Sequence, residues 1–131
     1  MIADPPSEEP FFTDPRYRLA VAAFADHDWY LAHDAFEELW HESSGEIRAL
    51  LHGLIQISVA EYHLENGNTR GSTLLMAEGL NHLRAVDLSF SSFDLATLQS
   101  IVAARLSALL EGRSLVDLPL PSLGTLGSAT A

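Results

Sequence analysis

The sequence predicts an all-α fold, a single antiparallel helical bundle of about five helices with extended N- and C-terminal tails. Three observations support this prediction. Leu and Ala are the two commonest residues, apolar side chains recur at helical spacing, and no segment alternates as a strand would. Short polar breaks separate the helical segments, so consecutive helices should pack antiparallel. The 131 residues suffice for one domain with its own core.

The chain divides into three regions. Residues 1–12 are rich in Pro and acidic side chains, and we expect them to form a flexible arm. Residues 13–112 carry the helical patterns and form the bundle domain. Residues 113–131 contain several Pro and Gly residues without a helical period, so they should form a loosely held tail.

Two short helices are expected at the start of the bundle. Thr13 or Asp14 can cap the first, with Pro15 at its first position, where a missing N–H costs nothing. Either Asp of the segment Ala25–Asp28 can cap the second, which should run to about His41. The side chains expected to face the core are Leu19, Ala20, Ala23 and Phe24 in the first helix, and Leu31, Ala35, Phe36, Leu39 and Trp40 in the second.

A long third helix should occupy the centre of the bundle. Ser43 and Glu46 have the spacing of a capping box, which would open this helix. It should run to about Glu65, where Asn66 and Gly67 form a stop signal. Its apolar residues cover most of the helix circumference, and such a helix is usually surrounded by others.

Two further helices complete the predicted bundle. Asn68 or Thr69 can cap a fourth helix that ends near Val86, and Asp94 can cap a fifth over Leu95–Glu111. The expected inward side chains are Leu74, Leu75, Leu80 and Leu83 in the fourth helix, and Leu98, Ile101, Val102, Leu106, Leu109 and Leu110 in the fifth.

Charge and composition exclude several classes of function. The net charge is −11, all seven basic residues are Arg, and Cys is absent. Thiolate and lysine chemistry are therefore excluded, and the acidic balance should repel nucleic acid and anionic membranes. Neither a membrane span nor a secretory signal is visible in the sequence. We expect a cytoplasmic protein whose partner is another protein or a second copy of itself.

Imidazole, carboxyl and carboxamide groups gather on the second and third helices. Five of the six His residues fall between positions 27 and 63. If the turn centres near residue 44 or 45, His33 lies opposite Gln56 and Glu37 lies opposite His52. The sequence therefore predicts a buried hydrogen-bonded network that fixes the helix register. The members on one face of the second helix are His33, Glu37 and Trp40. Those on one face of the third helix are His52, Gln56 and His63.

A metal site is the alternative interpretation. His33 and Glu37 could ligate a divalent cation, with His52 or His63 as the third ligand and Gln56 orienting a water molecule. The candidates for a catalytic carboxylate are then Glu37, Asp34 and Glu38. A strong zinc motif would place two His residues on one helical turn, and here that turn carries one. The structural network is therefore preferred, no cofactor is identified, and enzymatic activity is left open.

A third interpretation is a small-ligand pocket between the same two helices. It would need an enclosed apolar cavity beside Trp40. Tyr30, Phe36 and Tyr62 could line such a pocket, but aromatic residues at helical spacing usually belong to the core. The remaining polar residues are expected on solvated faces, with His82 at the surface or rim; these include Glu38, Glu42, Glu61, Glu65 and Glu78.

Three sequence blocks resemble the signatures of a small helical family known as domain of unknown function 309. Residues 29–40, WYLAHDAFEELW, are similar to its aromatic, Ala-His-Glu and Glu-Glu-Leu-Trp pattern. Residues 51–63 are similar to its Gly-Leu-Ile-Gln and Tyr-His pattern, and residues 67–71 to its Gly-Asn-x-x-Gly pattern. This chain has Asp34 where the family usually has Glu, and Ser72 where it usually has Ala.

The resemblance covers about residues 17–84 and implies an all-α bundle, but it does not imply an activity. It places weight on the residues that the family motifs stress, as members of a pocket or polar network. These are His33, Glu37, Trp40, Gln56, His63 and Asn68.

Overall fold

A computed structural model of the protein describes residues 9–88 and 94–124. Within these ranges all regular structure is helical, which confirms the predicted all-α bundle of about five helices. A one-turn helix, α1, precedes the five longer ones. The helices are α1 (Glu9–Phe12), α2 (Pro15–Ala25), α3 (Trp29–Trp40), α4 (Gly45–Glu65), α5 (Thr69–Arg84) and α6 (Leu95–Glu111).

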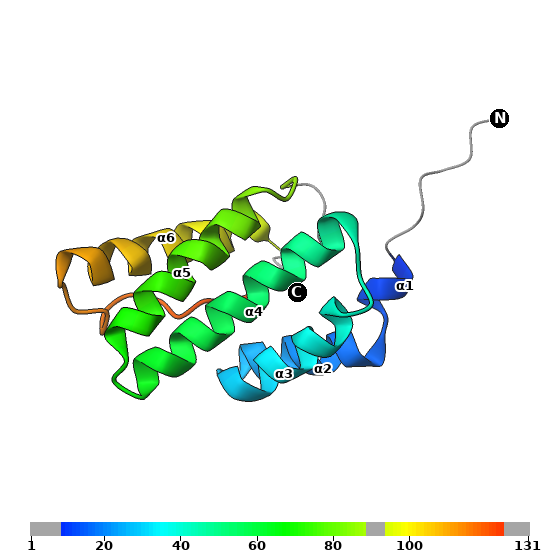
Figure 1. Ribbon diagram of the computed structural model, residues 1–131, viewed down its shortest axis with the longest axis horizontal. Coiled ribbons are helices and arrows are strands. Elements are labelled where there is room, and N and C mark those ends of the chain that lie inside the picture. Colours follow the sequence, from blue (N-terminus) through cyan, green and yellow to red (C-terminus); the bar gives the residue numbers. More distant parts are fainter. Residues whose placement is uncertain (1–8, 89–93, 125–131) are drawn as a thin grey trace.

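The long helix α4 lies at the centre of the fold (Figure 1). It packs against α3 on one side and α5 on the other, while α2 packs on α3 and α6 packs on α5. Buried residues occur on all sides of α4, including Leu50, Leu54 and Ile57. The prediction of a central helix that is apolar nearly all round is therefore confirmed.

Four of the longer helices begin with a side-chain cap. Each capping oxygen accepts a hydrogen bond from a backbone N–H two or three residues later, which satisfies a donor that the helix itself cannot pair. Of the two candidate caps that the sequence offers for each helix, the structure has Asp28 for α3 and Asp14 for α2. The caps are Asp14 for α2, Asp28 for α3, Asn68 for α5 and Asp94 for α6.

The capping box predicted for α4 is wrong. The cap position is Ser44, whose side chain makes no capping hydrogen bond. The Ser43 hydroxyl instead donates to the carbonyl oxygen of Leu39, at 2.7 Å, in the last turn of α3. The Glu46 carboxylate accepts from the backbone N–H of Asp87, at 2.9 Å, and so links the start of α4 to the segment after α5.

Several Leu residues expected in the core are instead exposed. They include Leu19, Leu31 and Leu74, and also Leu110. In α5 the buried face is formed by other residues, so Leu74 is left on the exposed face. The buried residues are Ser72, Met76, Gly79, Leu80 and Leu83. Small residues on this face allow the helix to approach α4 closely, and an apolar pattern weighted towards Leu does not identify such a face.

Gly53 and Gly79 set the distance between α4 and α5. A Cβ atom on Gly53 would lie 2.7 Å from the Leu83 Cδ2 atom and 3.1 Å from the Gly79 carbonyl oxygen. A Cβ atom on Gly79 would lie 2.8 Å from the Ile57 Cδ1 atom. The backbones of the two helices are thus in near contact, and a larger residue at Gly53 meets backbone that cannot rotate away.

The two ends of the described chain pack on the bundle. The turn of α1, in the region expected as an arm, packs the rings of Phe11 and Phe12 on Tyr17, with centroids 4.9 and 5.3 Å away. After α6 the chain returns to the start of that helix, where the Asp94 N–H donates to the Gly124 carbonyl oxygen. Residues 1–8 of the arm and 125–131 of the tail lie outside the described residues.

A buried ion pair joins α4 to α6. The Arg105 guanidinium donates to both carboxylate oxygens of Glu61, each at 2.7 Å, and also to the Pro119 carbonyl oxygen at 3.3 Å. The two side chains are only 3% and 2% exposed. Glu61 was expected on a solvated face, and this expectation is wrong, because the face of α4 that carries it is covered by α6 and the returning C-terminal segment.

In the described part of the chain, no helix has the combination of length and apolar character needed to cross a bilayer.

The first prediction concerns the close approach of α4 and α5. Gly→Ala in a helix interior normally stabilises by up to about 1 kcal/mol. We expect Gly53→Ala to lower the free energy of unfolding instead, by about 1–3 kcal/mol, because the added methyl group is forced against backbone. Urea denaturation measures the change. Gly79→Ala is the matched control. It should lower the free energy of unfolding by less, since the end of the Ile57 side chain can move. A Gly53→Ala protein more stable than the parent contradicts the close contact.

The second prediction concerns the buried ion pair. Arg105→Met leaves the Glu61 carboxylate buried without its partner, and we expect a loss of about 3–5 kcal/mol in the free energy of unfolding. Adding Glu61→Leu should recover most of that loss. Arg113→Met breaks the exposed pair with Glu111 and should change the free energy of unfolding far less, because solvent screens exposed charges. Equal losses at Arg105 and Arg113 in urea denaturation would show that burial does not matter.

Candidate functional site

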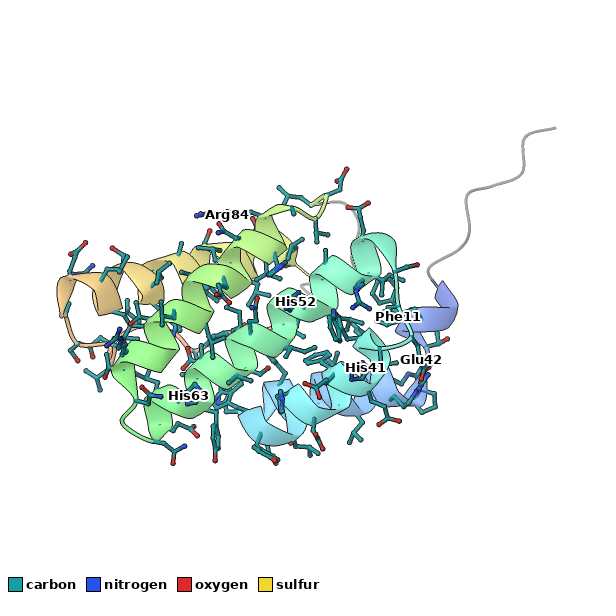
Figure 2. The ribbon with its side chains drawn as sticks, viewed as in Figure 1. Phe11, His41, Glu42, His52, His63 and Arg84 are labelled. Carbon is teal, nitrogen blue, oxygen red and sulfur yellow. The ribbon has the colours of Figure 1, made fainter. Side chains whose placement is uncertain are left out.

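The polar residues singled out in the sequence fall into three separate groups rather than one network. His33 pairs with Glu37 within α3, His63 lies beside Asn68, and Gln56 bonds to residues of α5. Figure 2 shows His52 and His63 at separate places along α4. The helix hairpin that was predicted is present, but its polar side chains pair in different directions.

The first group lies on α3. The His33 Nε2 atom is 3.4 Å from a carboxylate oxygen of Glu37, one helical turn later. The Glu37 side chain is about half exposed, whereas that of His33 is mostly covered. This pair is therefore a local surface contact and does not connect α3 to α4.

The second group connects α4 to α5. The Gln56 amide nitrogen donates to the Glu78 carboxylate at 2.9 Å, and its carbonyl oxygen lies 2.7 Å from His82 Nδ1. His82 Nδ1 also lies 3.0 Å from the Glu78 carbonyl oxygen. Both neighbours of Nδ1 are acceptors, so this nitrogen carries a hydrogen. The His52 ring lies over the His82 ring, with centroids 4.0 Å apart.

Trp40 and Arg48 flank the second group. The guanidinium of Arg48 lies 3.9 Å from the centroid of the Trp40 ring, a cation–π contact. The Arg48 Nη1 atom donates to the carbonyl oxygens of Trp40 and Ser43, at 3.0 and 3.3 Å. A cation at the last carbonyls of α3 is favourable, because these groups lack partners within the helix. Trp40 also contacts His52, with ring centroids 5.4 Å apart.

The third group holds the turn between α4 and α5. The Asn68 backbone N–H donates to the His63 carbonyl oxygen at 2.8 Å, and its side-chain oxygen accepts from the Gly71 N–H at 2.9 Å. The Asn68 amide nitrogen lies 3.5 Å from the His63 ring. A Cβ atom on Gly71 would lie 2.5 Å from that amide nitrogen, so a larger residue here would displace the Asn68 side chain from its present position.

The register of α3 against α4 differs from the predicted one by about one helical turn. Ring contacts join Tyr30 to Tyr62, at a centroid distance of 5.6 Å, and Trp40 to His52. The expected pairing of His33 with Gln56 is therefore wrong, as is that of Glu37 with His52. In the observed register Arg48, in the first turn of α4, lies at the end of α3 and donates to the Trp40 carbonyl oxygen.

An open pocket lies between α3 and α4, at the end where α3 begins. Its volume is about 130 Å³, and its surface is almost entirely apolar. The third interpretation from sequence expected an enclosed cavity beside Trp40, and the pocket that exists is open and lies at the opposite end of α3. We call it the aromatic pocket; its lining residues are Trp29, Tyr30, His33, Val59, Tyr62 and His63.

The arrangement gives the metal interpretation no cluster of ligands. Among residues 9–88 and 94–124, no group of three or more His, Asp or Glu side chains is placed to hold a metal ion. His33, Glu37, His52 and His63, the ligands considered from sequence, are distributed over the three groups. The carboxylates considered as a general base, Asp34 and Glu38, are exposed and do not line the aromatic pocket.

Sequence reasoning missed three features of the site. Tyr30 and Tyr62 were considered as pocket lining but the core was preferred for them, and they are exposed and line the pocket. Glu78 is exposed and His82 lies at the rim, as expected, but their contacts with Gln56 were not predicted. For the ion pair a signal existed: Arg105 is the one charged residue in α6 before the last position of that helix.

The pKa of His52 lies below its ordinary value. Burial disfavours the charged ring, and the positive charges of His82 and Arg48 act in the same direction, while Glu78 opposes them. The folded protein therefore prefers the neutral ring. The unfolded chain takes up a proton near the ordinary value of 6.5, so stability from this group is complete above that pH and is lost as the pH falls towards the lowered pKa.

The third prediction tests this dependence. Between about pH 7 and 5 the free energy of unfolding of the parent protein should fall, and His52→Gln should make that fall shallower, because the variant has no ring to protonate. Urea denaturation at a series of pH values measures both slopes. NMR titration of the His52 ring gives a direct check, and His82→Gln should move its midpoint part of the way back. A midpoint above 6.5 contradicts the argument.

The comparison with known proteins supports the family resemblance. The model of the family described as "Domain of unknown function (DUF309)" matches residues 17–75, which run from α2 into α5 and include the aromatic pocket. No curated protein is significantly similar to the chain. Residues 17–75 of this chain therefore match the model of the family DUF309, as the three sequence blocks predicted.

Proposed function

We propose that the chain is a non-enzymatic interaction module that binds a protein partner through the α3–α4 face. This face is the surface formed by the six residues of the aromatic pocket. The observation that carries the proposal is the exposure of two tyrosines on it, since Tyr30 is 59% and Tyr62 is 38% exposed. Their rings contact each other across the two helices, so they form one aromatic surface rather than scattered single residues.

Exposed tyrosines of this kind are typical of protein interfaces. A Tyr ring offers a large contact area with few rotatable bonds, and its hydroxyl group tolerates both water and a polar partner. Trp29 and Val59 extend the same surface inward, where it becomes an apolar pocket. A pocket that can receive one side chain of a partner is the common arrangement at the centre of an interface.

The charge of the chain favours a partner with a basic surface. The net charge of −11 attracts basic proteins and repels nucleic acid. It also disfavours self-association through this face, because two copies bring the same negative charge together. A different protein is therefore the partner that the electrostatics support best.

The fourth prediction tests the module by photo-crosslinking in the cells that make the protein. Tyr30 is replaced by the photoreactive residue benzoylphenylalanine, which keeps an aromatic ring on the face. We expect irradiation to join it to one specific protein. The same replacement at Leu110, which is 69% exposed on α6, is the control position and should not crosslink to that protein.

A second pair of variants distinguishes a specific contact from a chance one. Tyr62→Leu, added to the Tyr30 crosslinker, should abolish the product, whereas Tyr62→Phe keeps the ring and should preserve it. Purified partner must then crosslink to purified module with the same pattern. Equal products from the Tyr30 and Leu110 positions, or a product that consists of two copies of this chain, would refute the proposal.

A further inference from the structure

We propose that the aromatic pocket recognises an alkylammonium group, carried on a lysine-type side chain of the partner protein. This inference rests on the proposed function and adds the chemistry of what enters the pocket. Two observations support it independently: the shape and lining of the pocket, and the charge of the residues around it.

The volume of the pocket fits one small group. It measures about 130 Å³, and an apolar cavity of about 150 Å³ in another protein accepts a benzene molecule. A trimethylammonium group on a methylene chain is of this size. Sites for free small molecules usually have volumes of roughly 300–1,000 Å³ and enclose most of the ligand. The pocket therefore suits one side chain of a larger partner better than a free metabolite.

Five of the six lining residues carry aromatic rings, and four of these rings are in contact with one another. The Tyr30 ring contacts Tyr62 at 5.6 Å and His33 at 5.7 Å between centroids, and Tyr62 contacts His63 at 6.2 Å. Faces of tyrosine and tryptophan rings attract cations through their quadrupoles, and such cages are the common binding sites of methylated ammonium groups. The lining contains no Arg, so it carries no permanently charged group to attract an anion.

Acidic residues accompany the pocket on both helices. Asp28 precedes Trp29 at the start of α3, and the Glu37 carboxylate contacts His33 of the lining. Glu65 lies two residues beyond His63 at the end of α4. Asp28, Glu37 and Glu65 are adjacent or close in sequence to lining residues, and their negative charge favours a cation over an anion at this end of the bundle. A neutral group of equal size would gain the apolar contact without this attraction.

The test compares two probes of the same shape. Choline carries a trimethylammonium head, and 3,3-dimethylbutan-1-ol replaces its charged nitrogen by carbon. We expect choline to shift the NMR signals of Tyr30, Tyr62 and His63 in the purified full chain, and to bind about tenfold more tightly than the neutral alcohol. Equal affinity of the two probes would overturn the inference, because the pocket would then select shape and not charge.

Matched variants assign binding to the ring. Tyr62→Phe should bind choline about as well as the parent, and Tyr62→Leu, which keeps apolar bulk but removes the ring, should bind it roughly tenfold more weakly. Circular dichroism and the melting temperature verify that both variants are folded; Val59→Ala serves as a second variant if Tyr62→Leu fails to fold, and should also weaken binding. Unchanged choline binding in a folded Tyr62→Leu protein contradicts the inference.

An experiment with peptides distinguishes a free small cation from a cation carried on a side chain of a partner protein. A short Gly/Ser peptide with one trimethyllysine should bind more tightly than choline, since the peptide also contacts the exposed ring of Tyr30, and the same peptide with norleucine should bind more weakly. Tighter binding of free choline would overturn the assignment to a partner side chain. Absence of binding by every cation, together with a specific Tyr30 crosslink, would overturn only this inference and leave the interaction module intact.

Discussion

The close contact between α4 and α5 at Gly53 and Gly79 is the constraint on which the arrangement of the site depends. Because the two backbones nearly touch, the side chains that flank the glycines reach directly from one helix to the other. Gln56 can therefore bond to both Glu78 and His82, and the His52 and His82 rings can overlap. With α4 fixed on this side, its opposite side is left to pack against α3 and to form the aromatic pocket.

The polar residues of α4 are thus shared among three neighbours. Gln56 and His52 point towards α5, Glu61 is covered by α6, and His63 supports the turn that follows. Of the polar residues of α4, Arg48 crosses to α3, where it donates to the Trp40 carbonyl oxygen at the end of that helix. At the opposite end of α3 the surface between the two helices is almost entirely apolar and forms the aromatic pocket, which is the surface that we propose a partner meets.

Much of the fold could be predicted from the sequence because it depends on local signals. Asp14, Asp28, Asn68 and Asp94 are caps whose effect is confined to one helical turn, and the apolar circumference of residues 45–65 indicates a central helix without knowledge of its neighbours. The family resemblance rests on contiguous blocks of sequence, and it was confirmed over residues 17–75.

The site was harder to predict because it depends on register and on small residues. The observed register of α3 against α4 differs by about one turn from the one that spacing predicts, and this difference changes which side chains face each other. Gly53 and Gly79 determine which face of α5 is buried, yet glycine contributes little to an apolar pattern. Tyr30 and Tyr62 contact each other across α3 and α4 in the observed register, so their exposure could not be read from helical spacing alone.

The ion pair between Glu61 and Arg105 has a consequence for how α6 can dock. A helix with an apolar stripe can slide along its neighbour by one turn, about 5.4 Å, and still bury a similar area. Here such a slide would separate the guanidinium from the carboxylate and leave both charges unsolvated in the interior. The pair therefore fixes the register of α6, because the energy of the protein is higher in every neighbouring register.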